Sequence, residues 1–242
     1  RAKSKIRKLE YMNALELINI GTKELQQKNI GTSRLDSELL LSKILNKKRE
    51  EVLINLNQKI SKRDFSKYKN YIKRRSQKEP IAYILEEKEF WNKSFFVSSD
   101  TLIPRPETEL LVEKLIEIFK DKQISILDIG TGSGCILISL LGELINSRGV
   151  GIDISKKALV VAKKNAKKHK ISNNIKFVYK SLNHKICQKF DLIVSNPPYI
   201  ESNQIEYLME DVKNFEPRIA LDGGNDGLDL IKKVIYKTEY IL

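Results

Sequence analysis

The pattern of apolar and polar residues changes about a third of the way along the chain. From about Met12 to Lys78, apolar residues recur at helical spacing, and no strand-like alternation is present. Ser61 stands three residues before Asp64, the spacing of a side-chain cap at the start of a helix. This pattern predicts a small all-helical domain over residues 12–85.

Short apolar runs alternate with helical patterns in the second half of the chain. Four of them predict buried strands, at Ile124–Ile129, Gly149–Ile154, Ile175–Tyr179 and Phe190–Ser195. Strands separated by helices are typical of a parallel, doubly wound α/β sheet. If the strand order is 3-2-1-4, the first and fourth strands are neighbours, and their carboxyl ends border the same crevice.

Three segments lie outside these two patterns. Glu89–Trp91 and Ser94–Val97, separated by Asn92-Lys93, predict a hairpin within a linker over residues 86–104, ahead of an α/β domain over residues 105–242. Residues 1–11 are basic and are predicted to be a tail. A helical pattern begins at Leu228 and runs to residue 242, where three further strands would be expected to follow, so we expect a C-terminally truncated domain with an exposed, aggregation-prone sheet edge.

A glycine-rich loop follows the first predicted strand. Gly130-Thr-Gly-Ser-Gly134 has neither the spacing of a dinucleotide fingerprint nor the ending of a P-loop, and no lysine follows it. Asp153 ends the next strand, at the position of a carboxylate that accepts hydrogen bonds from ribose hydroxyls. A ribose-bearing ligand without a pyrophosphate fits best, and S-adenosylmethionine (SAM) is the leading candidate. The alternative is an ordinary strand-to-helix turn with a solvated Asp153.

The fourth predicted strand ends in Asn196-Pro197-Pro198-Tyr199. Proline lacks an N–H and has a fixed φ, so this loop is stiff, with the Asn196 side-chain oxygen and the Pro197 carbonyl held as two acceptors. Two converging acceptors suit a planar NH₂ group. The alternative is a rigid turn at the end of a strand. If this loop and the glycine loop share a crevice, a methyl donor and an NH₂ clamp together imply methyl transfer to nitrogen.

The chain resembles the class I SAM-dependent methyltransferases at three motifs: Asp128-Ile-Gly-Thr-Gly-Ser-Gly134, Gly151-Ile-Asp153 and Asn196-Pro-Pro-Tyr199. Four further segments narrow the resemblance to the HemK/PrmC family, whose members are protein-(glutamine-N5) methyltransferases that modify the GGQ glutamine of class-1 peptide chain release factors. These segments are Glu79–Leu85, Glu89–Trp91, Leu102–Glu113 and Phe215–Leu221 with Gly223-Gly224. The resemblance extends over nearly the whole chain from about Met12.

The resemblance implies a Rossmann-like methyltransferase domain that uses SAM as methyl donor, preceded by a helical domain that recognises the release factor. The implied cofactor-binding residues are Gly130, Thr131, Gly132, Ser133, Gly134, Asp153, Ser181 and Asn196. The implied substrate-binding residues are Asn196, Pro197, Pro198 and Tyr199, of which Asn196 and Pro197 are the catalytic pair.

Two positions depart from the family pattern. Glu86 stands where the family often has glycine. Ser181-Leu182-Asn183 lacks the acidic residue that usually lies near the adenine ring; counting back from Asn196 puts Ser181 at that contact, and a one-residue gap would make it Leu182.

Composition adds limits to this interpretation. The net charge is +13, but lysines outnumber arginines 34 to 10 and are spread along predicted helices, which is typical of solvated faces. The charge would assist docking to an acidic protein or to ribosomal RNA, yet no tract predicts direct nucleic-acid binding. Cys135 and Cys187 match no metal or disulfide spacing, and no run of eighteen apolar residues or signal peptide is present. We therefore expect a soluble cytoplasmic enzyme that needs no metal.

Two other substrates stay open. A ribosomal protein glutamine would use the same chemistry, and the helical domain would decide between it and a release factor. Asn-Pro-Pro-Tyr would also clamp the exocyclic amine of adenine in DNA or RNA, although that class needs a base-flipping pocket and a separate target-reading region.

Overall fold

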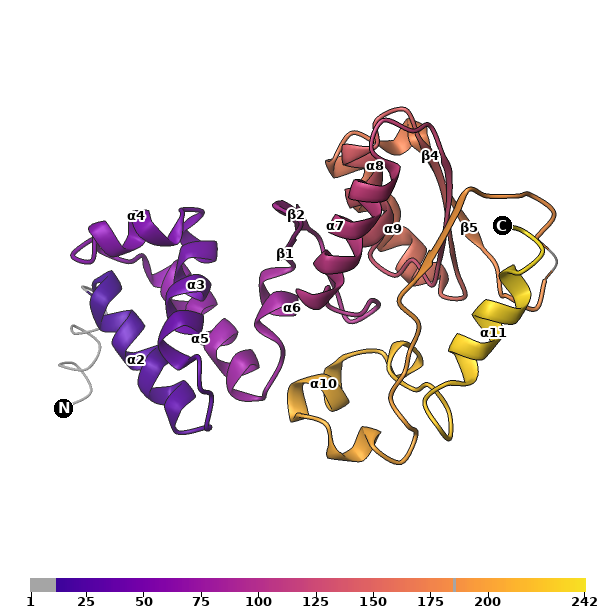
Figure 1. Cartoon of the computed structure of the whole chain (residues 1–242). Coiled ribbons are helices and arrows are strands. Elements are labelled where there is room, and N and C mark those ends of the chain that lie inside the picture. The colour runs from indigo at the N-terminus through magenta and orange to yellow at the C-terminus, as the bar shows by residue number, and fades with distance from the viewer. Residues whose placement is uncertain (1–11, 185) are drawn as a thin grey trace. The chain divides into compact units, whose positions relative to one another are not determined.

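The structure is a computed structural model that describes residues 12–184 and 186–242. It contains two compact units, the first ending at Leu85 and the second beginning at Glu86 (Figure 1). The basic residues 1–11, predicted to be a tail, lie outside the described residues. Within the described part of the chain, no helix combines the length and the apolar character needed to cross a membrane.

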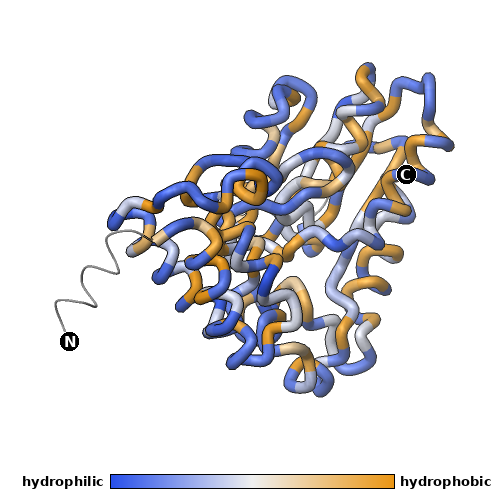
Figure 2. Tube along the Cα trace, turned by 90° about the vertical axis from the view of Figure 1, so that its left-hand side faces the viewer, coloured by the Kyte–Doolittle hydropathy of each residue, from blue (hydrophilic) through white to orange (hydrophobic). Residues whose placement is uncertain are grey.

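The first unit is helical, as predicted. Its helices are α2 (Ala14–Gln26), α3 (Ser33–Leu45), α4 (Arg49–Ile54), α5 (Lys62–Ser76) and α6 (Ile81–Leu85). The predicted cap is confirmed, because the Ser61 side chain accepts a hydrogen bond from the backbone N–H of Asp64 at the start of α5. Figure 2 shows the Cα trace coloured by hydropathy, with hydrophilic and hydrophobic residues interleaved along it.

Buried polar groups on α3 connect the helices of this unit. Asp36, 2% exposed, accepts a 2.7 Å hydrogen bond from the Arg75 guanidinium on α5. Glu38 contacts the guanidinium groups of Arg34 (2.5 Å) and Arg49 (2.7 Å). The Ser37 hydroxyl donates to the Ile18 carbonyl of α2. Charge-assisted bonds of this kind satisfy groups that would otherwise be costly to bury, and they fix which helix faces meet.

The second unit contains a four-stranded parallel sheet. Its strands are β3 (Ser125–Ile129), β4 (Arg148–Asp153), β5 (Ile175–Tyr179) and β6 (Leu192–Ser195), in the order β5-β4-β3-β6. When the four predicted strands are numbered 1 to 4 in chain order, this is the expected order 3-2-1-4. The first and fourth predicted strands are therefore neighbours, with Ile129 opposite Ser195 at their carboxyl ends.

Helices cover both faces of this sheet. The unit contains α7 (Glu107–Phe119), α8 (Cys135–Glu143), α9 (Lys156–Lys168), α10 (Glu210–Phe215) and α11 (Asp229–Thr238), with 3₁₀ turns η1 (Ser172–Asn174), η2 (Ile205–Tyr207) and η3 (Arg218–Ala220). One apolar cluster contains side chains of α7 and α8 together with Ile126 of β3 and Val194 of β6. A second joins Leu127 and Ile152 to α11 on the other face (Figure 1). This is the doubly wound arrangement that the sequence predicts.

The hairpin differs from the prediction by one residue. β1 (Lys88–Phe90) and β2 (Lys93–Phe95) pair with Phe90 opposite Lys93, so the turn is Trp91-Asn92, not Asn92-Lys93. Both turn residues have positive φ, 50° and 52°. Burial of Phe90 and Phe95, whose rings meet edge to face at 6.1 Å, selects this register, because a one-residue slip would turn both rings outward.

Candidate active site

The floor of a large cavity in the second unit is the glycine loop between β3 and α8. Gly130, Gly132 and Gly134 all have positive φ, a conformation that other residues seldom adopt. A Cβ added at Gly130 or Gly132 would meet almost nothing of the protein, so at these positions the open backbone faces space and not neighbouring side chains. A Cβ at Gly134 would instead lie 3.0 Å from Ile138 and 3.3 Å from Ala162. The first two glycines therefore shape the cavity, and the third allows α8 and α9 to pack.

The loop is held at the carboxyl ends of two strands. The backbone N–H groups of Gly130 and Thr131 both donate to the Ile152 carbonyl, at 2.9 and 3.0 Å. Asp153 accepts from the N–H of Gly132 through one carboxylate oxygen (2.9 Å) and from the N–H of Ser155 through the other (2.8 Å). Both oxygens keep further lone pairs, so the half-buried carboxylate is able to accept donors from a ligand.

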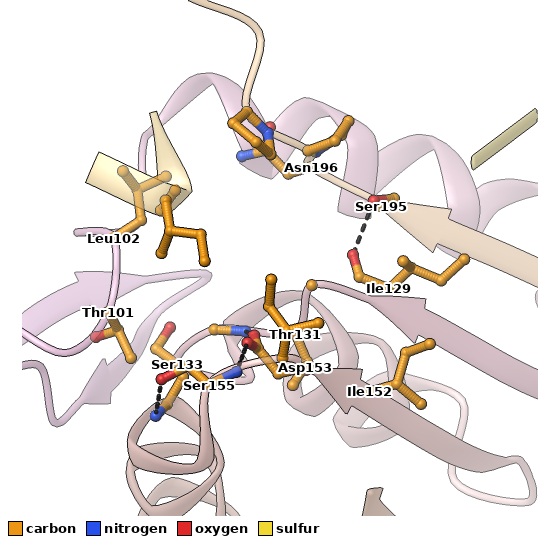
Figure 3. A pocket seen from close by; sticks show the side chains of 18 of the residues that line it. Thr101, Leu102, Ile129, Thr131, Ser133, Ile152, Asp153, Ser155, Ser195 and Asn196 are labelled. Carbon is orange, nitrogen blue, oxygen red and sulfur yellow. Dashed lines mark hydrogen bonds between the residues drawn. The ribbon is translucent and has the colours of Figure 1, made fainter. Parts of the chain in front are cut away.

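Asn196 lies across the cavity from Thr131 and Asp153 (Figure 3). The strand before it is tied to β3, because the Ser195 hydroxyl donates to the Ile129 carbonyl at 2.8 Å. The Asn196 side-chain Nδ2 lies 3.5 Å from the Thr108 Oγ1, to which it donates. Its Oδ1 therefore stays available as an acceptor, and among the described residues no backbone N–H donates to the Pro197 carbonyl.

A second glycine segment supports the loop from behind. Ile200 forms an isolated parallel bridge with Asp222, with hydrogen bonds from the Ile200 N–H to the Leu221 carbonyl and from the Gly223 N–H to the Ile200 carbonyl. A Cβ at Gly223 would lie 2.8 Å from the Tyr199 Cα and 2.9 Å from the Pro198 carbonyl oxygen. Only glycine permits this approach, which limits the movement of the Asn196–Tyr199 loop.

Most of the residues predicted from the sequence lie around this one cavity. Those that line it are Gly130, Thr131, Gly132, Ser133, Asp153, Ser181, Asn196, Pro197 and Pro198. Gly134 does not, because it packs against α9. Tyr199 does not either, and its side chain is 63% exposed. Ser181 and Leu182 both line the cavity, so the structure does not distinguish between them as the adenine contact.

Sequence reasoning missed one wall of the cavity. Pro104, Arg105 and Thr108 line it from the segment that leads into α7, and Pro217 and Ala220 line it from the segment around η3. Glu216 joins the two segments: its buried carboxylate accepts from the Arg105 guanidinium at 2.6 Å and from the Ile103 N–H at 3.2 Å. The signal was present, because both segments belong to motifs that carried the family resemblance, but no spacing rule connects residues more than a hundred positions apart.

Burial strongly raises the pKa of two ionisable groups beside the loop. Asp128, 1% exposed, accepts the Thr131 hydroxyl at 2.6 Å through Oδ2, while Oδ1 has no partner among the described residues. Desolvation raises the pKa of Asp128 to about 7. Cys135 lines the cavity, and burial raises the pKa of its thiol to about 12, so it stays protonated and is a poor nucleophile. Within residues 12–184 and 186–242, no group of three or more His, Cys, Asp or Glu residues is arranged to hold a metal ion.

Comparisons with known proteins agree with this architecture. The family model of the PrmC N-terminal domain matches residues 16–85, and that of the methyltransferase small domain matches residues 104–213. A release factor glutamine methyltransferase of Buchnera aphidicola subsp. Schizaphis graminum is 43% identical over 209 residues, which cover 86% of this chain and 75% of that protein. The chain belongs to the release factor glutamine methyltransferase family.

Further relatives of the family are similar at comparable levels. The release factor glutamine methyltransferase of Geobacter sulfurreducens is 37% identical over 212 residues, covering 87% of this chain and 74% of that one. A bifunctional methyltransferase of Rickettsia typhi is also 37% identical, but the match covers only 45% of its length. Among solved structures, the hMettl16 catalytic domain in complex with a 3′UTR hairpin has a TM-score of 0.51 at 19% identity, covering 70% of this chain and 63% of that one; it shares the fold.

Family membership confirms the resemblance deduced from the motifs and the expected methyltransferase fold. Of the two departures from the family pattern, Glu86 has a structural counterpart: its φ is 55°, the left-handed conformation in which glycine is favoured. The roles of individual site residues stay predictions, and they are taken up next.

Proposed function

We propose that the protein transfers a methyl group from SAM to the side-chain amide nitrogen of the GGQ glutamine of a class-1 peptide chain release factor. Family membership supports the reaction and the substrate. One observation supports assigning this reaction to particular residues: the glycine loop, Asp153 and Asn196-Pro197 line a single cavity.

The residues present fit SAM. Gly130 and Gly132 offer backbone that a ligand is able to approach closely, and no side chain fills the space above them. Asp153 would accept the ribose hydroxyls, while Leu182 or Ser181 would contact the adenine. When bound, SAM supplies an electrophilic methyl group on a positively charged sulfur.

The acceptor side of the cavity would act by orientation and electrostatics. A glutamine amide nitrogen is a poor nucleophile because its lone pair is delocalised into the carbonyl. The Asn196 Oδ1 and the Pro197 carbonyl would each accept one N–H of this NH₂, which holds the nitrogen in line and stabilises positive charge as the N–CH₃ bond forms and the S–CH₃ bond breaks. Pro198 and Tyr199 would flank the glutamine, and the released proton would pass to water.

The helical unit would recognise the release factor, since the PrmC N-terminal domain matches residues 16–85. A net charge of +13 would favour approach to an acidic partner surface or to ribosomal RNA. Because the proposed substrate belongs to translation, we expect the protein to act in the cytoplasm without a metal.

Radiolabelled SAM tests the proposal directly. The protein is incubated in parallel with a class-1 release factor, the same factor with its GGQ glutamine replaced, a ribosomal protein and DNA. We expect label only in the intact factor. Equal labelling of the substituted factor would refute the glutamine assignment, and labelling of the ribosomal protein or of DNA would transfer the proposal to that substrate.

A further inference from the structure

One polar contact near the candidate acceptor site has no role in the function described so far. The Asn196 Nδ2 donates to the Thr108 Oγ1 across 88 residues of sequence, at 3.5 Å. That is longer than an ordinary N–H···O hydrogen bond of about 2.7–3.2 Å, and bonds at catalytic sites often tighten when a substrate binds. Thr108 lies in the first turn of α7 and is half-buried at the cavity wall.

The orientation of the Asn196 amide decides what the site is able to bind. Turned by 180°, the amide would present its NH₂ to the cavity, and two NH₂ groups cannot accept from each other. The structure has the orientation in which Nδ2 donates to the Thr108 hydroxyl, which leaves Oδ1 for an incoming donor. The Thr108 hydroxyl is the one side-chain partner that the described residues give to this amide.

Thr108 is itself held firmly. Its backbone N–H donates to the Arg105 carbonyl at 3.1 Å. The Arg105 guanidinium donates to Glu216 at 2.6 Å, and the Glu216 side chain is only 1% exposed. The second Glu216 oxygen accepts from the Ile103 N–H. The segment before α7 is thus fixed to a buried carboxylate, which limits the movement of the Thr108 backbone.

We propose that Thr108 is a positioning residue that orients the Asn196 amide so that its oxygen accepts from the substrate NH₂. This inference rests on the proposed function, because it assigns a role within the same reaction. Thr108 acts through Asn196 and does not itself touch the reacting atoms. Its loss should therefore lower kcat with little change in the affinity for SAM.

Two substitutions separate the hydroxyl from the shape of the side chain. Thr108→Val keeps the shape and removes the hydroxyl, and we expect kcat to fall about tenfold, the scale of one hydrogen bond. Thr108→Ser keeps the hydroxyl and should recover most of that loss. Thr238→Val is the matched control, since this helical threonine of the same unit bonds to the Val234 carbonyl and does not line the cavity. If Thr108→Val loses its cooperative melting, Thr108→Ala replaces it with the same expectations, whereas loss of SAM affinity in a folded variant would contradict the inference.

The decisive measurement is a double-mutant cycle with Asn196→Ala. A positioning role predicts that Thr108→Val has no further effect once Asn196 is gone, whereas a purely structural role predicts additive losses. Unchanged kcat in Thr108→Val, equal losses in Thr108→Ser, or additivity in the cycle would overturn the inference. The unmodified protein with its release factor serves as reference: if it labels another substrate instead, the proposed function fails, and the cycle is run on that substrate.

Discussion

In the helical unit, the buried carboxylates of Asp36 and Glu38 contact arginine guanidinium groups, whereas in the sheet unit the buried carboxylate of Asp128 contacts the Thr131 hydroxyl and no cation among the described residues. Glu216, at the cavity wall, is intermediate: it is paired with Arg105, but burial still raises its pKa. Ion pairs thus fix the packing of helices in one unit. In the sheet unit, some polar groups near the cavity keep unused hydrogen-bond acceptors or lack an oppositely charged partner. This is typical of a site whose partner is a ligand.

The strongest test of this contrast is removal of a polar group that faces the cavity. Asn196→Ala should lower turnover by roughly two to three orders of magnitude, because a preorganised acceptor is lost. Its thermal stability and SAM affinity should change little, and these are measured by melting and calorimetry. Asn173→Ala, an exposed asparagine in η1, is the control. Near-normal turnover in Asn196→Ala would remove this residue from the catalytic pair.

The opposite result is expected for the ion pair of the helical unit. Arg75→Met leaves Asp36 buried without its partner and should lower the free energy of unfolding by roughly 3 kcal/mol, measured by urea denaturation. Arg63→Met, on the exposed side of the same helix, is the control. If the two variants unfold alike, the Asp36–Arg75 pair does not fix the packing of α3 and α5.

Asp153 tests the cofactor side of the cavity. Asp153→Ala should weaken SAM binding by roughly 1.5–3 kcal/mol, the scale of hydrogen bonds to a charged group, as measured by calorimetry. The control is Asp226→Ala, since the Asp226 carboxylate contacts Lys232 and does not line the cavity. Unchanged affinity in Asp153→Ala would contradict the ribose assignment.

Asp128 makes the stability of the sheet unit depend on pH. The unfolded chain releases this proton near its ordinary pKa of 3.8, but the folded chain retains it up to about pH 7. The folded state binds more protons in this window, so the free energy of unfolding should fall as the pH rises from about 4 to about 7, by roughly 2–4 kcal/mol. Denaturation of the protein and of Asp128→Asn at several pH values measures the difference. Parallel pH profiles for the two proteins would show that folding does not shift the pKa of Asp128.

Glu86 tests how much a strained backbone conformation costs at a position whose charge is exposed. The Glu86 side chain is exposed, and its φ of 55° is unfavourable for a residue with a Cβ. Glu86→Gly should be more stable than Glu86→Ala by about 1 kcal/mol, because both remove the charge and only glycine relieves the conformation. Equal melting temperatures for the two variants would argue that this conformation costs nothing.

The sequence predicted the parts of the molecule that depend on neighbours along the chain. Apolar runs located the four parallel strands, with β5 at its predicted bounds and the other three within two residues of theirs, and the glycine spacing located the cavity floor. Ser61 was found as a cap because its partner Asp64 is three residues away. Local patterns carry this information because strand burial and helix capping are themselves local.

The missed features depend on contacts between distant segments. Thr108 meets Asn196, and Arg105 meets Glu216, at separations of 88 and 111 residues. The hairpin turn was placed one residue late because ring burial, and not turn propensity, selects its register. The role of Gly134 in binding the cofactor stays a prediction, and the structure places this glycine against α9.

The bridge between Ile200 and Asp222 has a consequence for the order in which the cavity forms. The glycine loop and Asp153 belong to one strand–helix–strand segment, so they need only short loops to close. The acceptor loop is also held by Thr108, 88 residues before Asn196, and closing so long a loop costs more chain entropy; its other support, Gly223, is synthesised only after it. A nascent chain whose Gly223 is still inside the ribosome would lack the contact between Gly223 and the acceptor loop. We therefore expect the cofactor side to become ordered during synthesis before the acceptor side does.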